Sequence, residues 1–161
     1  MADMARTAQG DPVTPADDIE AQFTSADPEL HRNKQAAYKI FTILDEAGNW
    51  DRVNEFKTER YIQHDPFVPS GSAAVVKFFT ETHGVKPRPV EDKLRMKVVA
   101  VVAEGDMVTI ASARYLTNPH DPSETYTTTW FDMFRFVDGR ADEHWDCATL
   151  DMKEAPNLVG V

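Results

Sequence analysis

The sequence is short of positive charge and of long apolar runs. It has 17 Lys and Arg against 27 Asp and Glu, which gives a net charge of −10 at pH 7. This balance opposes binding to phosphate backbones and to anionic membrane surfaces, because both interactions need clustered cations. No apolar run approaches the roughly 18 residues that cross a bilayer. The sequence therefore predicts neither a nucleic-acid partner nor a membrane span.

Cysteine and the common catalytic fingerprints are also scarce. Cys147 is the single cysteine, so the chain can form neither an internal disulfide nor a CxxC zinc site. The first 20 residues are polar and acidic and lack the apolar region of a secretory signal. No G-x-S-x-G, P-loop or dinucleotide motif is present. We expect a cytoplasmic protein.

The composition is that of a folded domain. The chain has 161 residues, of which 42% are hydrophobic and 10% aromatic, and this length favours one domain with a real core. Residues 1–26 lack a sustained period and are predicted to form a flexible acidic tail. We expect a single domain over residues 27–152 and a second tail over 153–161.

The first half of the chain has the spacing of helices. Asp27 and Pro28 read as an N-cap and a first helical residue, and Gly48 as the stop of a helix with apolar positions three and four apart. Shorter helices are predicted over 49–57, and from a Ser-Gly-Ser cap at 70–72 to Gly84.

The second half alternates with a period of two. Strands are predicted from about residue 94 to a hairpin at 104–106, then over 107–117, 125–137 and about 140–150, whereas 61–64 reads as a short strand or an extended turn. Helices followed by an antiparallel meander indicate an α+β fold. Helices packed on a strongly curved antiparallel sheet would form a cone with an internal pocket.

Asp132 is the candidate that stands out in this sheet. Trp130, Asp132, Phe134 and Phe136 share one face of their strand, and the other face is also largely apolar, so we expect both faces to be covered. Burial of a carboxylate is costly and raises its pKa, which suits it to proton transfer near neutral pH. Spacing alone favours the structural alternative, a buried ion pair with an arginine such as Arg114 or Arg135.

Two histidines are further candidates. Asp142, His144 and Asp146 are predicted to share a face of the last strand, either orienting the imidazole or forming a solvated acidic face. His64, beside Asp65 and a proline, is either a catalytic group or a turn cap. A set of His64, Asp132 and His144 could bind a metal in principle, but the spacing carries no metal signature. We predict no metal.

Two stretches resemble SnoaL-like proteins. One is YIQHDP at residues 61–66 with the Val-Pro-x-Gly turn at 68–71; the other is FDMFR at 131–135 with DGR at 138–140 and EHWD at 143–146. The resemblance covers residues 28–150 and implies the nuclear-transport-factor-2-like fold. Asp65 stands where such proteins are expected to have Asn, and Ala141 where a larger aliphatic residue is usual.

The resemblance also implies a chemistry. The best-understood relatives are polyketide cyclases that close rings by intramolecular aldol condensation, with an aspartate as acid/base and no cofactor or metal. Ketosteroid isomerases and small-molecule dehydratases share the fold. The Asp-x-Phe-Arg pattern matches the cyclase aspartate to Asp132.

We therefore predict a cofactor-independent acid/base enzyme that acts on a small, largely apolar carbonyl compound. Asp132 would move the proton and His64 or His144 would polarise the oxygen. The remaining substrate-binding positions are predicted at Tyr61, Trp130, Phe134 and Asp146. Two alternatives stay open: a non-catalytic ligand-binding module, and an interaction protein whose sheet forms a dimer face. A homodimer is expected in any case, because both sheet faces are apolar.

Overall fold

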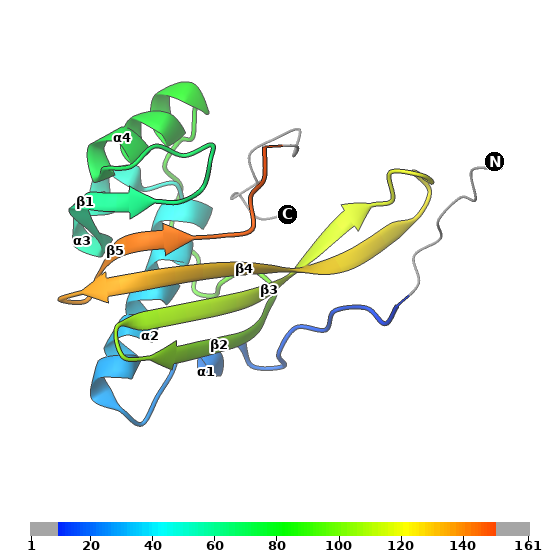
Figure 1. Cartoon of the computed structure of the whole chain (residues 1–161), viewed down its shortest axis with the longest axis horizontal. Coiled ribbons are helices and arrows are strands. Elements are labelled where there is room, and N and C mark those ends of the chain that lie inside the picture. The colour runs from blue at the N-terminus through cyan, green and yellow to red at the C-terminus, as the bar shows by residue number, and fades with distance from the viewer. Residues whose placement is uncertain (1–9, 151–161) are drawn as a thin grey trace.

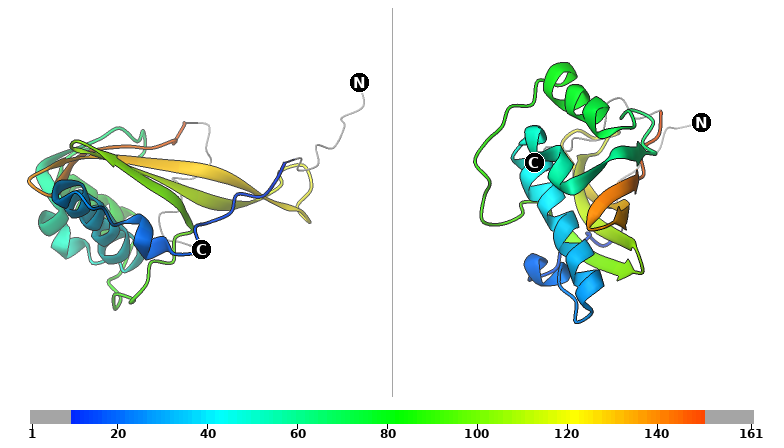
Figure 2. Two further views of the ribbon diagram at one scale, coloured as in Figure 1. Left: turned by 90° about the horizontal axis from the view of Figure 1, so that it is seen from below. Right: turned by 90° about the vertical axis from the view of Figure 1, so that its left-hand side faces the viewer.

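The fold is α+β, with helices on one side of a five-stranded sheet (Figures 1 and 2). The computed structural model describes residues 10–150, so the tail predicted over 153–161 lies outside the described residues. The strands follow the spatial order β1-β5-β4-β3-β2. Their bounds are β1 Lys57–Gln63, β2 Val98–Glu104, β3 Met107–Thr117, β4 Thr125–Val137 and β5 Arg140–Trp145.

The helices begin and end where local signals place them. Their bounds are α1 Ile19–Gln22, α2 Pro28–Lys39, η1 Ile40–Glu46, η2 Trp50–Arg52, α3 Val53–Phe56, α4 Ser72–Lys77 and η3 Phe78–Thr82. As predicted, the Asp27 carboxylate caps α2 by accepting from the N–H of Glu29 and Leu30. Two segments, η1 and η3, are π-helical continuations of α2 and α4. In the described residues no helix has the length and apolarity to cross a membrane.

The segment before α2 packs on the domain, whereas the sequence predicted a flexible tail as far as residue 26. The Ala16 N–H donates to the Val98 carbonyl at 2.8 Å, and the Val13 N–H donates to Thr127 Oγ1 at 2.7 Å. Phe23 is fully buried and belongs to the core. The packed structure therefore starts earlier than the predicted boundary at residue 27.

The sheet is mixed rather than purely antiparallel. Strand β1 lies at one edge and pairs with β5 in parallel, with Gln63 opposite His144. The other three pairings are antiparallel, as predicted. The parallel edge strand matters for function, because it carries side chains from the first half of the chain to the end of the sheet where β5 and β4 hold the predicted site.

A bulge in β2 changes one face from that expected of strict alternation. The pairing of β2 with β3 shifts between Val98 and Ala100. Val101 is therefore buried and Val102 is 65% exposed, whereas a strict period of two would place Val102 on the same face as the buried Val98. On β4 the predicted inner face is correct, since Trp130, Asp132, Phe134 and Phe136 are buried. The opposite face is not covered in the single chain, where Phe131 is 48% exposed.

The core lies between the inner face of the sheet and the helices (Figure 2). Its aromatic centre includes Trp50 stacked on Phe79, with ring centroids 4.1 Å apart, and Phe41 set edge-on against Phe134. Away from the helices, β3 and β4 continue as a two-stranded arm (Figure 1). The helix-covered end of the sheet is therefore where a buried site can form.

Candidate functional site

The structure brings Asp132 and His144 together on the inner face of the sheet. Antiparallel pairing sets His144 opposite Phe134, and Asp132 lies two residues before Phe134 on the same face. The His144 Nε2 atom is 3.2 Å from Asp132 Oδ1, and both side chains are buried. The Phe134 ring stacks on the imidazole with centroids 4.5 Å apart. His144 is thus in contact with two other predicted site residues, Asp132 and Phe134.

Gln63 orients this histidine. Its Oε1 atom lies 2.7 Å from His144 Nδ1, a contact that the parallel pairing of β1 with β5 makes possible. With Oε1 as the acceptor, Nδ1 carries a proton and donates it, and Nε2 is the atom presented to Asp132. No role is predicted for Gln63 from the sequence, because its contact depends on a strand pairing that no local pattern reveals.

Lys57 is a buried amine on the same side of the sheet. Its Nζ atom lies 3.9 Å from the Tyr61 ring centroid and 5.6 Å from the Trp50 ring centroid. No carboxylate among residues 10–150 is recorded in an ion pair with it. Burial lowers the pKa of Lys57 to about 8, against the opposing influence of Asp45 and Asp132.

Asp45, on η1, is the second buried charge that the sequence analysis missed. Burial raises its pKa to about 7, opposed by Lys57 and reinforced by Asp132 and Glu46. The sequence could have predicted its burial, because Asp45 follows Phe41 by four positions and so lies on the apolar face of its helix.

These groups line a cavity of about 20 Å³, which has room for about one water molecule. The ligand-sized pocket that the sequence predicted is therefore not seen in this part of the chain. The Tyr61 hydroxyl is buried and without a hydrogen-bond partner among the described residues, and burial raises its pKa well above the usual value. The lining consists of Phe41, Asp45, Trp50, Lys57, Tyr61, Gln63, Val75, Phe79, Asp132, Phe134 and His144.

The arginines named as structural partners of Asp132 are engaged elsewhere. Arg135 pairs with Asp106 at 2.8 Å and with Glu143 at 3.3 Å. The Arg114 guanidinium lies over the Trp130 ring, 3.9 Å from its centroid. Asp132 acts on Arg114 only as a nearby charge, and its own side-chain contact is with His144.

Trp130 and Asp146 stand at the margin of the cavity rather than in its lining. The Trp130 ring is buried, and its Nε1 atom has no partner among the described residues. Asp146 is half-buried, and burial raises its pKa to about 6, with a further contribution from the adjacent Asp65. Asp65 is buried, so the residue in the position where the family is expected to have Asn brings a second carboxyl group to this margin.

His64 does not join the site. Its Nε2 atom lies 3.2 Å from Glu143 Oε2, and its ring stacks on Trp145 with centroids 4.7 Å apart. Both partners alternate with His144 along β5 and face the other side of the sheet. The prediction that His64 assists Asp132 is therefore wrong in its geometry.

Asp142 also departs from the predicted face. The pairing of β4 with β5 shifts so that Arg135 lies opposite Glu143 and Phe136 opposite Ala141, which leaves Asp142 as the extra residue of a bulge. Its carboxylate binds Thr58 and the exposed Arg60, which also pairs with Glu143. Asp142 is thus a structural partner of β1, and only His144 and Asp146 remain of the predicted acidic face.

Three of the residues could hold a metal ion. Asp132, His144 and Asp146 each offer a ligand atom, and these atoms lie within 4.8 Å of one another. The set differs from the one considered from the sequence, since Asp146 takes the place of His64. Two carboxylates and an imidazole suit a divalent cation, although the 3.2 Å contact between His144 and Asp132 already pairs two of the three ligand atoms.

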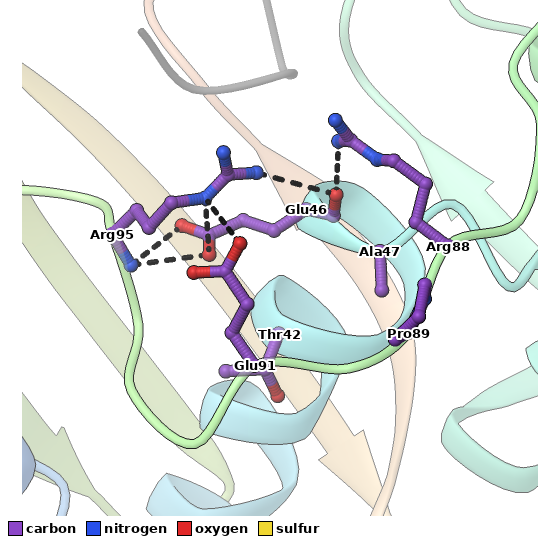
Figure 3. A pocket seen from close by; sticks show the side chains of 7 residues that line it. All are labelled: Thr42, Glu46, Ala47, Arg88, Pro89, Glu91 and Arg95. Atoms are coloured by element: carbon purple, nitrogen blue, oxygen red, sulfur yellow. Dashed lines mark hydrogen bonds and ion pairs between the residues drawn. The ribbon is translucent and has the colours of Figure 1, made fainter.

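A larger cavity, of about 270 Å³, lies on another side of η1 (Figure 3). The Glu46 carboxylate accepts from the backbone N–H of Arg95 and Met96, and its carbonyl accepts from the Arg88 guanidinium. These contacts pin the loop between η3 and β2 to the helix end. Because Glu46 contacts both Arg88 and Arg95 across this cavity, we interpret the cavity as a structural junction.

The family assignment follows from a match over most of the fold. The SnoaL-like domain model matches residues 35–144. The chain belongs to the SnoaL-like family. A comparison with curated proteins found no match.

Several solved structures share this fold. A putative polyketide cyclase from Bacillus cereus ATCC 10987 aligns with a TM-score of 0.53 and 16% identity over 85% of each chain. An LEH-like epoxide hydrolase from M. tuberculosis aligns with a TM-score of 0.52 and 14% identity, over 74% of this chain and 84% of that one. A Xanthomonas campestris protein of unknown function with a cystatin-like fold aligns with a TM-score of 0.50 and 17% identity, over 80% and 98%. At these identities the likeness shows the fold alone.

Proposed function

We propose that this SnoaL-like protein is a cofactor-independent acid/base enzyme that acts on a small carbonyl compound. The observation that carries the proposal is the buried contact between Asp132 and His144 at the wall of a cavity. A carboxylate beside an imidazole can take and return a proton near neutral pH. The fold is shared with a putative polyketide cyclase and an epoxide hydrolase, which supports small-molecule chemistry by analogy.

In the proposed reaction Asp132 removes a proton from the carbon next to the carbonyl. His144, whose Nδ1 is held by Gln63, accepts a hydrogen bond at Nε2 from the protonated Asp132, and Asp132 then returns the proton. The Tyr61 hydroxyl has no hydrogen-bond partner within residues 10–150, so it can donate to the carbonyl oxygen as negative charge develops there. Isomerisation, dehydration and aldol-type cyclisation all begin with this proton removal.

The size of the cavity restricts the substrate. Space for about one water means that even a small ketone must displace lining side chains on entry. Part of the wall consists of the aromatic rings of Phe41, Trp50, Phe79 and Phe134, which suit an apolar body. We therefore propose a small, largely apolar carbonyl compound.

A nearly filled interior also supports a second candidate. An interaction protein needs no substrate cavity, and its buried charges would serve only to hold the fold together. Both candidates share the family fold, so proton exchange on a simple ketone is the decisive measurement.

The test follows α-proton exchange of acetone and cyclopentanone in D₂O by NMR. If Asp132 is the base, Asp132→Asn should lower the enzyme-dependent exchange rate by about 100-fold or more, since general acid–base catalysis contributes roughly 10²–10⁴. Its melting temperature should change little, because the amide keeps the size of the carboxyl and can still bond to His144.

Asp106→Asn is the matched control. Asp106 is exposed, pairs with Arg135 and lies outside the cavity, so its variant should exchange protons at the wild-type rate. Wild-type protein that exchanges neither ketone, or an Asp132→Asn variant that exchanges at the wild-type rate, would favour the interaction protein.

A further inference from the structure

Lys57 is a buried amine whose position the acid/base reaction does not require. It opens β1, and its Nζ atom reaches the cavity between the rings of Tyr61 and Trp50. A buried ammonium without an ion pair is costly. Cation–π contacts recover only about 0.5–2 kcal/mol of such a cost. A neutral amine would meet this environment at lower cost.

The charges around Lys57 come from three other elements. Asp45 lies on η1, Asp132 on β4 and His144 on β5, and all three line the same cavity as Lys57. Asp45 and Asp132 act on the amine as nearby negative charges. The amine therefore has acid/base groups around it and an apolar wall behind it, which is the environment that turns a lysine into a nucleophile.

We propose that Lys57 forms an imine with an aldehyde or ketone in the cavity. The inference rests on the proposed function for the carbonyl class of the ligand, and it adds that the ligand is held covalently during proton transfer.

The step balances without an oxidant or a reductant. The neutral Nζ attacks the carbonyl carbon, a C–N bond forms, and the carbonyl oxygen takes a proton to become the hydroxyl of a carbinolamine. Nitrogen then gives up a proton, for which Asp45 is a nearby acceptor, and the hydroxyl takes a further proton and leaves as water while the C=N bond forms. The protonated imine withdraws electrons, so Asp132 removes the neighbouring carbon-bound proton more easily than from the free ketone.

Lys34 shows what a structural lysine looks like in the same protein. Its Nζ donates to the carbonyls of Gln22 and Val101 at 3.0 and 2.8 Å. Burial lowers its pKa too, but both hydrogen bonds hold the amine in place and away from the cavity. Lys34 is therefore the internal control for Lys57.

The experiment traps the imine in the full-length wild-type protein. The protein is incubated with acetone and cyanoborohydride near pH 7.5, digested, and mapped by mass spectrometry for reduced isopropyl adducts. Lys57 should be modified at least about tenfold faster than Lys34 or the exposed Lys97, because burial lowers its pKa to about 8 and its side chain lines the cavity, whereas two carbonyls hold the Lys34 amine and Lys97 lies outside the cavity. An adduct on Lys57 that forms no faster than on these two lysines would overturn the proposal.

Variants separate this proposal from the acid/base function. Asp132→Asn should still give the Lys57 adduct while α-proton exchange is lost. Lys57→Arg keeps a positive charge but cannot form an imine, so it should lower exchange by about tenfold or more. Exchange by wild-type protein without any Lys57 adduct would overturn the imine and leave the acid/base function standing. An adduct on Lys57 without α-proton exchange would overturn the acid/base function and leave the imine standing.

Discussion

At the scale of single residues, the charges in the cavity set how stability depends on pH. Asp45 and Lys57 are both buried, and burial pushes each toward its neutral form. The raised pKa of Asp45, about 7, means that the folded state holds its proton where the unfolded chain has released it. Ionisation of Asp45 therefore works against folding as the pH rises from about 4 to about 7.

Asp45→Asn should remove this pH dependence. The wild type should lose stability relative to the variant across that window, by up to a few kcal/mol, because each unit between the folded and unfolded pKa corresponds to about 1.4 kcal/mol. Above about pH 8 the lowered pKa of Lys57 has the opposite effect on stability. The unfolded state then binds the Lys57 proton better than the folded state does, so the free energy of unfolding rises with pH. Urea unfolding of both proteins at several pH values measures the effect, and parallel curves between pH 4 and 7 would contradict it.

The same residues show what the sequence reveals about a site. Asp132 could be found because a carboxylate in a run of alternating aromatics breaks a clear pattern. Lys57 could not, because the sequence reads it as the end of a short helix, whereas it opens β1 with its side chain turned inward. His64 was misplaced for a related reason: it follows Gln63 in the chain, and alternation along an extended segment sends neighbours to opposite faces.

At the scale of secondary-structure elements, the end of η1 fixes the position of Asp45. The helix stops at Gly48, whose φ of +69° is accessible to glycine at little cost. A Cβ at this position would lie 2.8 Å from both the Lys86 carbonyl oxygen and Val85 Cγ1. The loop between η3 and β2 therefore packs directly against the glycine, and the turn and the loop depend on each other.

Gly48→Ala should destabilise the protein by roughly 2–4 kcal/mol, combining backbone strain of about 1–2 kcal/mol with the clash against the loop. Gly84→Ala is the matched control, because Gly84 has a similar φ of +64° but a Cβ there would have nothing within 4 Å. The control should lose only about 1 kcal/mol. Thermal or urea unfolding compares the two, and equal losses would show that the loop contact contributes nothing.

The sequence predicts a helix or strand well where the residues that determine it are close together in the chain. Strands β3 and β4 fall on the predicted residues, because long alternation and a hairpin or Asp-Gly turn mark their ends. The bulges in β2 and β5 left no mark in the pattern, and each moved a side chain to an unexpected face. The parallel pairing of β1 joins residues about 80 positions apart, a contact that no local rule addresses.

At the scale of the whole molecule, the outer face of the sheet exposes apolar side chains that nothing else in residues 10–150 covers. The helices cover the inner face (Figure 2), while Val102 on β2 and Phe131 on β4 are exposed on either side of β3. Exposed apolar patches are a common feature of protein surfaces that associate. We expect this outer face to pair with a second copy of the chain.

The dimer is tested by a pair of matched substitutions. Light scattering of the wild type at micromolar concentration should give about twice the chain mass of 18.1 kDa. Val102→Glu should weaken the dimer by about tenfold or more, since burying a carboxylate in an apolar interface costs more than 1.4 kcal/mol. Val90→Glu introduces the same charge at an exposed valine in the loop away from the sheet and should leave the dimer intact. A wild type that stays at 18.1 kDa, or two variants that dissociate alike, would show that the outer face is not the interface.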